Sequence, residues 1–234
     1  MDLLQALTTT GAVRDFSPAP VPDETVYRIL EAARFAPSGG NRQAWRLVLV
    51  KDRDKRRRLR DLYLVGWYEY LAARAAGLTP WAPLTDRDRE VQAMARAAEM
   101  KPPAGDPGGM AENLDRVPVL LVLLADLRGL AAVDRDADRY TMVGGASVYP
   151  FAWSILLAAH EAGLGGVITT MLVRSEPEVL DLLGVPEGWA LAAALALGFP
   201  AGPRPTRLRR AGPEQFTTVD GFDGPELGRP TIVV

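Results

Sequence analysis

The chain has 234 residues, of which 48% are hydrophobic and 24% charged, and its formal net charge is −2. These values fit one medium-sized domain with a large core, and they argue against a nucleic-acid-binding protein, which carries a basic face. The absence of cysteine and the single histidine, His160, exclude disulfides, thiolate nucleophiles and Cys-ligated metals and leave little material for a catalytic triad. We therefore expect any catalysis to use other side chains or a bound cofactor.

No segment resembles a targeting signal or a membrane anchor. The N-terminus lacks the basic and apolar regions of a signal peptide. The longest apolar stretches, Val117–Ala125 and Ala190–Phe199, are much shorter than the roughly 20 residues that cross a bilayer. We expect a cytoplasmic protein with neither a membrane nor a nucleic acid as partner.

The first fifty residues predict two helices and a strand. Asp2–Thr10 has the pattern of a short amphipathic helix, and Asp23 is a good N-cap for a second helix. The second helix should end near Ala36, because a residue before proline avoids the α region. After a loop, Trp45–Val50 has the pattern of a strand. The second helix is expected to bury one face, formed by Val26, Ile29, Leu30 and Ala33.

Residues 52–113 combine a long charged helix with an irregular segment. Asp52–Ala76 is helical in pattern, and its Arg56–Arg58 run is interpreted as a solvated face rather than an anion site. A short helix is predicted near Asp86–Glu99. The stretch 102–109 is rich in glycine and proline, which is typical of a mobile flap.

The second half predicts two buried strands and two helices. Val117–Ala125 and Leu191–Gly198 are apolar throughout, as in strands that are buried on both faces. Ala146–Ala162 is apolar on almost every side, which places it in a core or an oligomer interface. Ser175–Glu178 has the pattern of a capping box, and Gly184 should end the helix that follows.

The tail from Arg204 is rich in proline and glycine and ends in the β-type sequence Thr231–Val234. Such an end indicates an arm that reaches another strand, and a strand of a partner subunit is one possibility. A few strands far apart in the sequence, with many helices between them, indicate an α+β fold.

Common nucleotide and metal motifs are absent or incomplete. The chain has no P-loop sequence, and Gly163–Gly166 lacks the spacing of a dinucleotide fingerprint. His160 lies on the apolar helix and is interpreted as structural. Asp134, Asp136 and Asp138 alternate as in a calcium loop, but the glycine and the closing glutamate of such a loop are missing.

Three loop segments have the residues to hold a flat, phosphorylated cofactor. Arg14 follows the first helix, and the small-residue turn Pro37–Gln43 allows close backbone approach through its glycines. Arg207, Arg209 and Arg210 offer forked donors for a phosphate. Taken alone, the turn is equally compatible with an ordinary connecting loop.

Several segments occur in the order found in one known family. In the first half they are Val13–Phe16, Pro20–Pro22, Ile29–Arg34 and Ala36–Trp45. In the second half they are Gly144–Ser147, Ala162–Gly166, Glu178–Pro186 and Leu197–Pro200. Together they resemble the flavin-dependent nitroreductase superfamily over most of residues 1–210, but not over residues 64–113 or the tail.

The resemblance implies an α+β fold with a central, mostly antiparallel sheet flanked by helices and a C-terminal arm exchanged across a homodimer. Residues 1–210 would form the FMN-binding domain, with a variable insertion at about 64–113, and residues 211–234 an extension. FMN would bind at the subunit interface, NADPH or NADH would be the reductant, and a nitroaromatic, a quinone or a related small molecule the acceptor. No side chain is expected to be catalytic, because flavin N5 carries the chemistry.

The resemblance also implies residue roles. Arg14 matches a basic residue near the flavin pyrimidine. The loop that contacts the flavin from the other subunit is matched by Pro37, Ser38, Gly39 and Asn41, and the flavin edge by Gln43. The segment beside the ring is matched by Ile168, Thr169 and Thr170, and the basic pair at the phosphate by Arg207 and Arg209.

The chain departs from the family before Val13, where Thr10, Gly11 and Ala12 replace the usual arginines and serine. Either Arg207, Arg209 and Arg210 compensate, or FMN binds more weakly. Residues 64–113 are expected to decide the substrate. The aromatic side chains of this region either stack on a planar acceptor or simply pack the added helices. These side chains are Trp67, Tyr68, Tyr70 and Trp81.

Other functions remain open at this level. On the same fold they are a flavin-dependent dehydrogenase or reductase of a natural-product intermediate, a dehalogenase and a flavin-destroying enzyme. A different class is a non-catalytic flavin-binding, storage or regulatory protein, which the replaced arginines favour.

Overall fold

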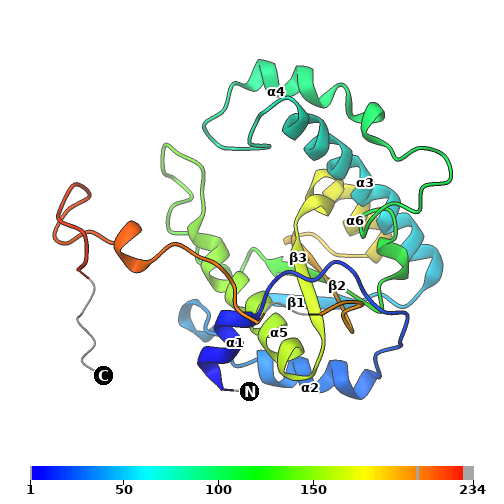
Figure 1. Ribbon diagram of the computed structural model, residues 1–234, viewed down its shortest axis with the longest axis horizontal. Helices are drawn as coiled ribbons and strands as arrows, with labels where there is room; N and C mark the ends of the chain where they lie inside the picture. The colour runs from blue at the N-terminus through cyan, green and yellow to red at the C-terminus, as the bar shows by residue number, and fades with distance from the viewer. Residues whose placement is uncertain (1, 204–205, 229–234) are drawn as a thin grey trace.

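A four-stranded antiparallel sheet forms the centre of the computed structural model, which describes residues 2–203 and 206–228 (Figure 1). The strand order is β1 (Trp45–Leu49), β2 (Val119–Asp126), β4 (Trp189–Gly198) and β3 (Gly165–Thr169). Every neighbouring pair is antiparallel, so the predicted α+β fold with a central antiparallel sheet is confirmed. β1 and β3 are the two edge strands.

Helices cover both faces of this sheet (Figure 1). One face is covered by α2 (Asp23–Ala33) and α5 (Tyr149–Glu161), with α1 (Leu3–Thr9) packed on α5. The other is covered by α3 (Arg53–Ala75) and α6 (Glu176–Leu183), with α4 (Arg87–Met94) beyond α3. Short 3-10 turns are η1 (Gly39–Asn41), η2 (Ala97–Met100), η3 (Leu114–Arg116), η4 (Val143–Ser147), η5 (Met171–Ser175) and η6 (Pro213–Gln215). No helix within these described residues is long and apolar enough to cross a membrane.

The residues of β2 alternate between two hydrophobic clusters. Val119, Leu121 and Leu123 belong to the cluster with α2 and α5, whereas Leu120 and Val122 belong to the cluster with α3 and α6. Successive side chains of a strand point to opposite faces, so a strand covered on both sides must be apolar at every position. The expectation of a strand buried on both faces is therefore confirmed.

Two predicted helix caps are wrong. Asp23 is the first residue of α2, and Pro22 occupies the cap position without a side-chain hydrogen bond. Ser175 occupies the cap position of α6, but its hydroxyl donates to the Leu62 carbonyl oxygen at 3.3 Å instead of accepting from the helix. A tertiary partner on α3 has replaced the local one. Gly184 ends α6 in the left-handed conformation, as predicted.

The prediction that Arg56–Arg58 form a solvated face is wrong for Arg56. Arg56 is half-buried, and its Nε donates to the Asp115 carbonyl oxygen at 2.8 Å, while another guanidinium nitrogen donates to the Val117 carbonyl oxygen. Arg57 and Arg58 are exposed. The fold therefore recruits Arg56 to hold the chain that leads into β2.

The C-terminal tail leaves the body of the domain and carries exposed aromatic residues. Residues 211–228 run away from the sheet (Figure 1), and Phe216 and Phe222 are 70% and 95% exposed. Leu208 still contacts the domain, since its N–H donates to the Thr8 carbonyl oxygen at 2.8 Å. The predicted strand Thr231–Val234 lies outside the described residues.

Gly66 on α3 is required where η5 crosses the helix. A Cβ placed on Gly66 would lie 2.8 Å from the Met171 carbonyl oxygen and 2.8 Å from Arg174 Cγ. Alanine is about 1 kcal/mol better than glycine in a helix interior, but we expect the clash to outweigh this gain, at about 1–3 kcal/mol for overpacking. Gly66→Ala should therefore lower the urea midpoint of unfolding, and an increased midpoint would contradict the close approach.

Candidate functional site

Arg14 lies in a segment that meets the outer edge of β3 at Ala12 and then passes to the end of β4, where Phe16 bridges Pro200. Ala12 forms a parallel bridge with Gly166, and the Val13 N–H donates to the Gly166 carbonyl oxygen at 2.9 Å. A Cβ on Gly165 would lie 2.4 Å from Val13 Cγ2, so the glycine permits this approach. These backbone contacts fix the position from which the exposed Arg14 side chain starts.

Arg14 lines a cavity of about 520 Å³, which we call the Arg14 pocket. Gly108 and Gly109 of the glycine-rich segment form part of its wall, and Arg116 joins them. The Arg116 N–H donates to the Asn113 carbonyl oxygen at 2.9 Å. Within the described residues, the guanidinium groups of Arg14 and Arg116 line the pocket without a side-chain hydrogen bond or ion pair, and such groups suit a ligand with anionic or carbonyl oxygens. Arg116 was missed from the sequence, where an arginine before a buried strand carries no distinctive signal. The other lining residues are Asp15, Phe16, Ser17, Pro18, Met110, Asn113, Val117 and Pro118.

The glycine-rich wall of the Arg14 pocket is tied to the residues that follow it. Asn113 Nδ2 donates to the Pro107 carbonyl oxygen at 2.7 Å and to the Gly109 carbonyl oxygen at 2.9 Å. The Gly109 N–H in turn donates to Glu112 Oε2 at 2.8 Å. The segment has no regular structure, as predicted, but these bonds hold its glycines against the pocket.

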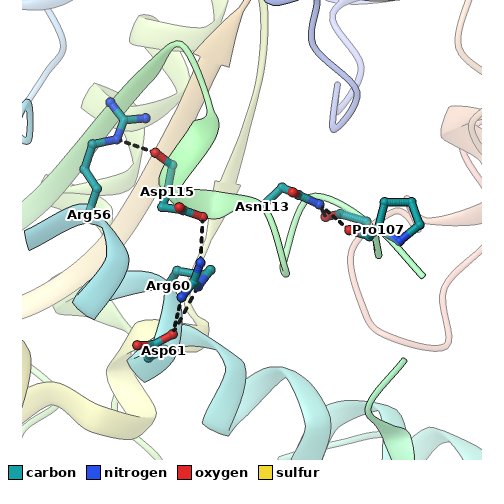
Figure 2. A network of polar contacts seen from close by, with 7 residues as sticks. Arg56, Arg60, Asp61, Pro107, Asn113 and Asp115 are labelled. Carbon is teal, nitrogen blue, oxygen red and sulfur yellow. Dashed lines mark hydrogen bonds and ion pairs between the residues drawn. The ribbon is translucent and has the colours of Figure 1, made fainter. Parts of the chain in front are cut away.

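An arginine network attaches the same region to α3 (Figure 2). Arg56 reaches the backbone of Asp115, and Arg60 forms an ion pair with the Asp115 carboxylate at 3.3 Å. Arg60 also contacts Asp61 at 2.8 Å. Because the Asp115 ion pair is partly buried, it is less screened by solvent than a surface pair, and it fixes η3 beside the pocket.

The turn Pro37–Gln43 contains residues with left-handed backbone conformation. Ser38 Oγ accepts from the Gln43 N–H at 3.0 Å, and the Gly39 N–H donates to Ser147 Oγ at 3.0 Å. These bonds hold the turn in a left-handed conformation, which is uncommon outside glycine and is frequent at ligand sites. The residues with positive φ are Gly40, Asn41 and Gln43.

The structure does not bring this turn to the Arg14 pocket within one chain. The turn leads into β1, whereas the segment that contains Arg14 contacts β3, and β1 and β3 are the opposite edge strands of the sheet. The turn also precedes Trp45, which pairs with Ala125 near the end of β2, whereas Val117 and Pro118 of the pocket precede the start of that strand. The length of β2, at about 3.3 Å per residue, therefore lies between the turn and the pocket. The two predicted parts of the site are therefore apart in a single protomer.

The predicted segment Ile168–Thr170 ends β3 and contacts α3. Ile168 and Thr169 pair with Leu195 and Ala194 of β4, and Thr170 follows the strand. The Thr169 hydroxyl lies 2.9 Å from the Tyr63 hydroxyl, which is buried on α3. Burial raises the pKa of Tyr63, so this phenol stays protonated in the physiological range.

The basic pair Arg207 and Arg209 lies beside the end of α1. The Leu208 bond to Thr8 places this part of the tail next to the helix, two residues before Thr10. Both arginines are exposed. The tail therefore brings two cations to the neighbourhood of Thr10–Ala12, where the resemblance implies basic residues that this chain lacks.

The four aromatic residues of the insertion fall into two groups. Trp67 stacks on Tyr70 at 5.6 Å between ring centroids, and Tyr70 stacks on Trp81 at 6.3 Å. The Arg174 guanidinium caps this column 5.6 Å from the Trp81 ring. Tyr68 is buried apart from the column, and its pKa is raised by burial and by Glu112, the same side chain that holds the Gly109 N–H.

His160 and Asp134 have structural partners. His160 is buried and lies 2.8 Å from the Thr9 hydroxyl, which connects α5 to α1. Asp134 accepts from the Met142 N–H at 2.8 Å and pairs with Arg139 at 2.8 Å. Both residues therefore hold loops and helices in place, in line with the structural interpretation of the histidine.

Comparison with known proteins connects this arrangement to one family. The chain is 27% identical over 206 residues to iodotyrosine deiodinase 1 of Rattus norvegicus, covering 86% of this chain and 62% of that protein. It is 31% identical over 201 residues to an NADH dehydrogenase of Thermus thermophilus, covering 86% and 88% of the two chains. The chain thus spans less than two thirds of the length of the deiodinase.

Solved structures share the fold. A crystal structure of oxidized iodotyrosine deiodinase bound to FMN and 3-iodo-L-tyrosine superposes with a TM-score of 0.62 at 24% identity, covering 93% of this chain and all of that one. The sequence profile of the "Nitroreductase family" matches residues 8–199, from the end of α1 to the end of the sheet. Because this match includes most of the chain, the protein belongs to the nitroreductase family, whose enzymes are oxidoreductases.

Proposed function

We propose that this chain binds FMN and reduces an electron-poor acceptor, a nitroaromatic or a quinone, with NADH or NADPH as the reductant. The observation that carries the proposal is the Arg14 pocket, whose lining combines two glycines with two arginines whose side chains form no hydrogen bond or ion pair among the described residues. The similarity to an NADH dehydrogenase supports a pyridine nucleotide as the donor. Bound FMN supplies the redox chemistry through hydride exchange at flavin N5.

The residues of the Arg14 pocket fit a flavin. A flavin presents carbonyl oxygens and ring nitrogens at one edge, and guanidinium and backbone N–H groups are suitable donors for them. The Arg14 cation would stabilise negative charge on the reduced ring. A Cβ on Gly108 would lie 2.6 Å from Glu112 Cβ, so only glycine keeps this wall close to its anchor. We assign cofactor contacts in this protomer to Arg14 in the pocket and, outside the residues that line it, to Ile168, Thr169 and Thr170.

We infer that the site is completed by a second copy of the chain. The turn Pro37–Gln43 lies at the opposite sheet edge from Arg14, so in one protomer it is remote from the pocket. A homodimer would supply Pro37, Ser38, Gly39, Asn41 and Gln43 from the partner. The tail with its exposed Phe216 and Phe222 is suited to cover apolar surface of that partner.

Light scattering after size exclusion tests the shared site. The expected mass of the flavin-bound protein is twice 25.3 kDa. Cofactor binding should depend on protein concentration if the dimer dissociates, because each site needs both chains. A monomer that retains FMN would contradict the shared geometry.

The redox proposal predicts a yellow protein. FMN added to purified protein should remain bound after gel filtration, and its absorbance should bleach under anaerobic conditions with NADH or NADPH and return on addition of a quinone or a nitroaromatic. A protein that FMN does not reconstitute would contradict the enzyme function. A yellow protein that no pyridine nucleotide reduces would favour the flavin-binding alternative, which the replacement of the usual arginines by Thr10, Gly11 and Ala12 supports.

The acceptor site is proposed to include the aromatic column of the insertion. Trp67 and Trp81 would stack on a planar acceptor, and Tyr68 would act through Glu112 on the glycine wall. The similarity to deiodinases adds a halogenated phenol to the acceptors worth testing. Trp81→Leu should raise KM for an aromatic acceptor more than for a pyridine nucleotide. A KM for the aromatic acceptor equal to that of the wild type would show that the aromatic column only packs the added helices.

A further inference from the structure

Tyr63 is a buried polar side chain that sequence reasoning did not select. It lies on α3 in the cluster that covers one face of the sheet, and it is only 2% exposed. Its hydroxyl lies 2.9 Å from Thr169 Oγ1 at the end of β3. A phenylalanine would fill the same space, so the hydroxyl needs an explanation of its own.

The Tyr63 hydroxyl contacts the end of β3 and is influenced by two charged residues of the candidate site. Thr169 is its hydrogen-bond partner, the charge of Arg14 acts on it in the direction that lowers its pKa, and Glu112 acts in the opposite direction. Both charges are therefore within electrostatic range of the phenol. These three residues come from the segment that meets β3, from β3 itself and from the anchor of the glycine wall.

We propose that Tyr63 is a positioning residue for the cofactor site, because its hydroxyl holds the Thr169 side chain and thereby fixes the end of β3. This inference rests on the proposed binding of FMN. Thr169 is the last residue of β3, and the chain turns at Thr170 into η5. Since β3 is an edge strand whose last pair is Thr169 with Ala194, a side-chain tether at this position restrains the turn that follows.

In the hydrogen bond between Tyr63 and Thr169, either hydroxyl can be the donor. A protonated tyrosine and a threonine each carry one O–H and can each accept, so the pair is satisfied without a titratable partner. Burial keeps the tyrosine neutral, and the arrangement should therefore persist across the physiological pH range. Gly66 strengthens the same contact, because it lets η5 lie directly on α3 one turn further along.

Four variants test the proposal: Tyr63→Phe, Thr169→Val, their combination, and Thr169→Ser. The readouts are the Kd for FMN from quenching of flavin fluorescence, the absorption spectrum of bound FMN, and urea unfolding of the FMN-free protein. Tyr27→Phe on the exposed face of α2 is the matched control for loss of a phenolic hydroxyl.

We expect Tyr63→Phe and Thr169→Val each to weaken FMN binding about three- to tenfold, as for the loss of one neutral hydrogen bond. The double variant should bind no more weakly than the weaker single variant, because both remove one shared interaction. Thr169→Ser retains a hydroxyl and should bind within about twofold of the wild type, and Tyr27→Phe should be unchanged. Variants of the pair should also shift the flavin spectrum.

A purely structural role has a different signature. If Tyr63→Phe lowers the urea midpoint of the FMN-free protein but leaves the Kd and the spectrum unchanged, the proposal is overturned. Additive effects of the two substitutions would also overturn it, since they would show two independent contacts. Absence of FMN binding by the wild type would refute the proposed function and this inference together, whereas binding by the wild type leaves the variants to decide Tyr63 alone.

Discussion

Replacing both Arg207 and Arg209 by alanine should weaken FMN binding more than tenfold and leave riboflavin binding nearly unchanged. The Leu208 bond to Thr8 places this pair beside Thr10–Ala12, where the usual arginines are missing. A hydrogen bond to a charged group contributes about 1.5–3 kcal/mol, so the loss of even one phosphate contact reaches about a tenfold change. Riboflavin lacks the phosphate and should not report the loss.

Titration with FMN and with riboflavin, at fixed protein and salt concentrations, measures this preference. The control is Arg28→Ala combined with Arg58→Ala, which removes the same charge from exposed positions on α2 and α3. Equal weakening of both flavins would mean that the tail acts on the fold and not on the phosphate. Unchanged FMN affinity would refute the assignment of the basic pair, and the chain would then bind FMN without any replacement for the missing arginines.

Gly166→Ala should destabilise the protein by about 1–3 kcal/mol, the usual range for overpacking a core. A Cβ at this position would lie 2.4 Å from Leu197 Cδ2 and 2.9 Å from the Ala196 carbonyl oxygen. Leu197 is fully buried and cannot move into solvent, and the carbonyl belongs to the backbone of β4. The strain should also displace the segment that bridges Gly166 and thus the Arg14 side chain.

Urea unfolding of the FMN-free protein measures the change, with protein concentration held constant because dimerisation would add to the apparent stability. Gly221→Ala is the matched control, because a Cβ there would meet nothing within 4 Å. An unchanged midpoint for Gly166→Ala would show that β3 and β4 separate easily at this position. A lower midpoint with unchanged FMN affinity would show that the Arg14 segment adjusts independently of the strand.

The periodic elements were predictable because their signals are local. β2 as far as Ala125 and β4 throughout are apolar, and α2 repeats its apolar residues at helical spacing, so each element indicates its own type and burial. β3 gave no such signal. Two of its five residues are glycines, which weaken a strand and are explained only by the close approach of Val13 and Leu197. The cap of α6 failed for a similar reason, because the Ser175 hydroxyl finds Leu62 from another helix.

In the candidate site too, some features have local sequence signals and others depend on tertiary contacts. The ordered motifs placed Arg14, the turn Pro37–Gln43 and the segment after Gly166 in one family's cofactor site, but they gave no information on distance. The structure shows that the turn and Arg14 occupy opposite edges of the sheet, from which a second copy follows as a proposal. It also adds Arg116 and Tyr63, whose importance depends on side chains more than fifty residues away.

The sequence by itself determined the fold class and the family, because apolar periodicity and ordered motifs are properties of the chain read in one dimension. The tertiary structure alone decided which groups meet. Arg14 shares a pocket with Arg116, Tyr63 holds Thr169, and the tail brings Arg207 and Arg209 to α1. These contacts depend on strand order and on the glycines that let segments approach, and neither property is encoded by the spacing of residues along the chain.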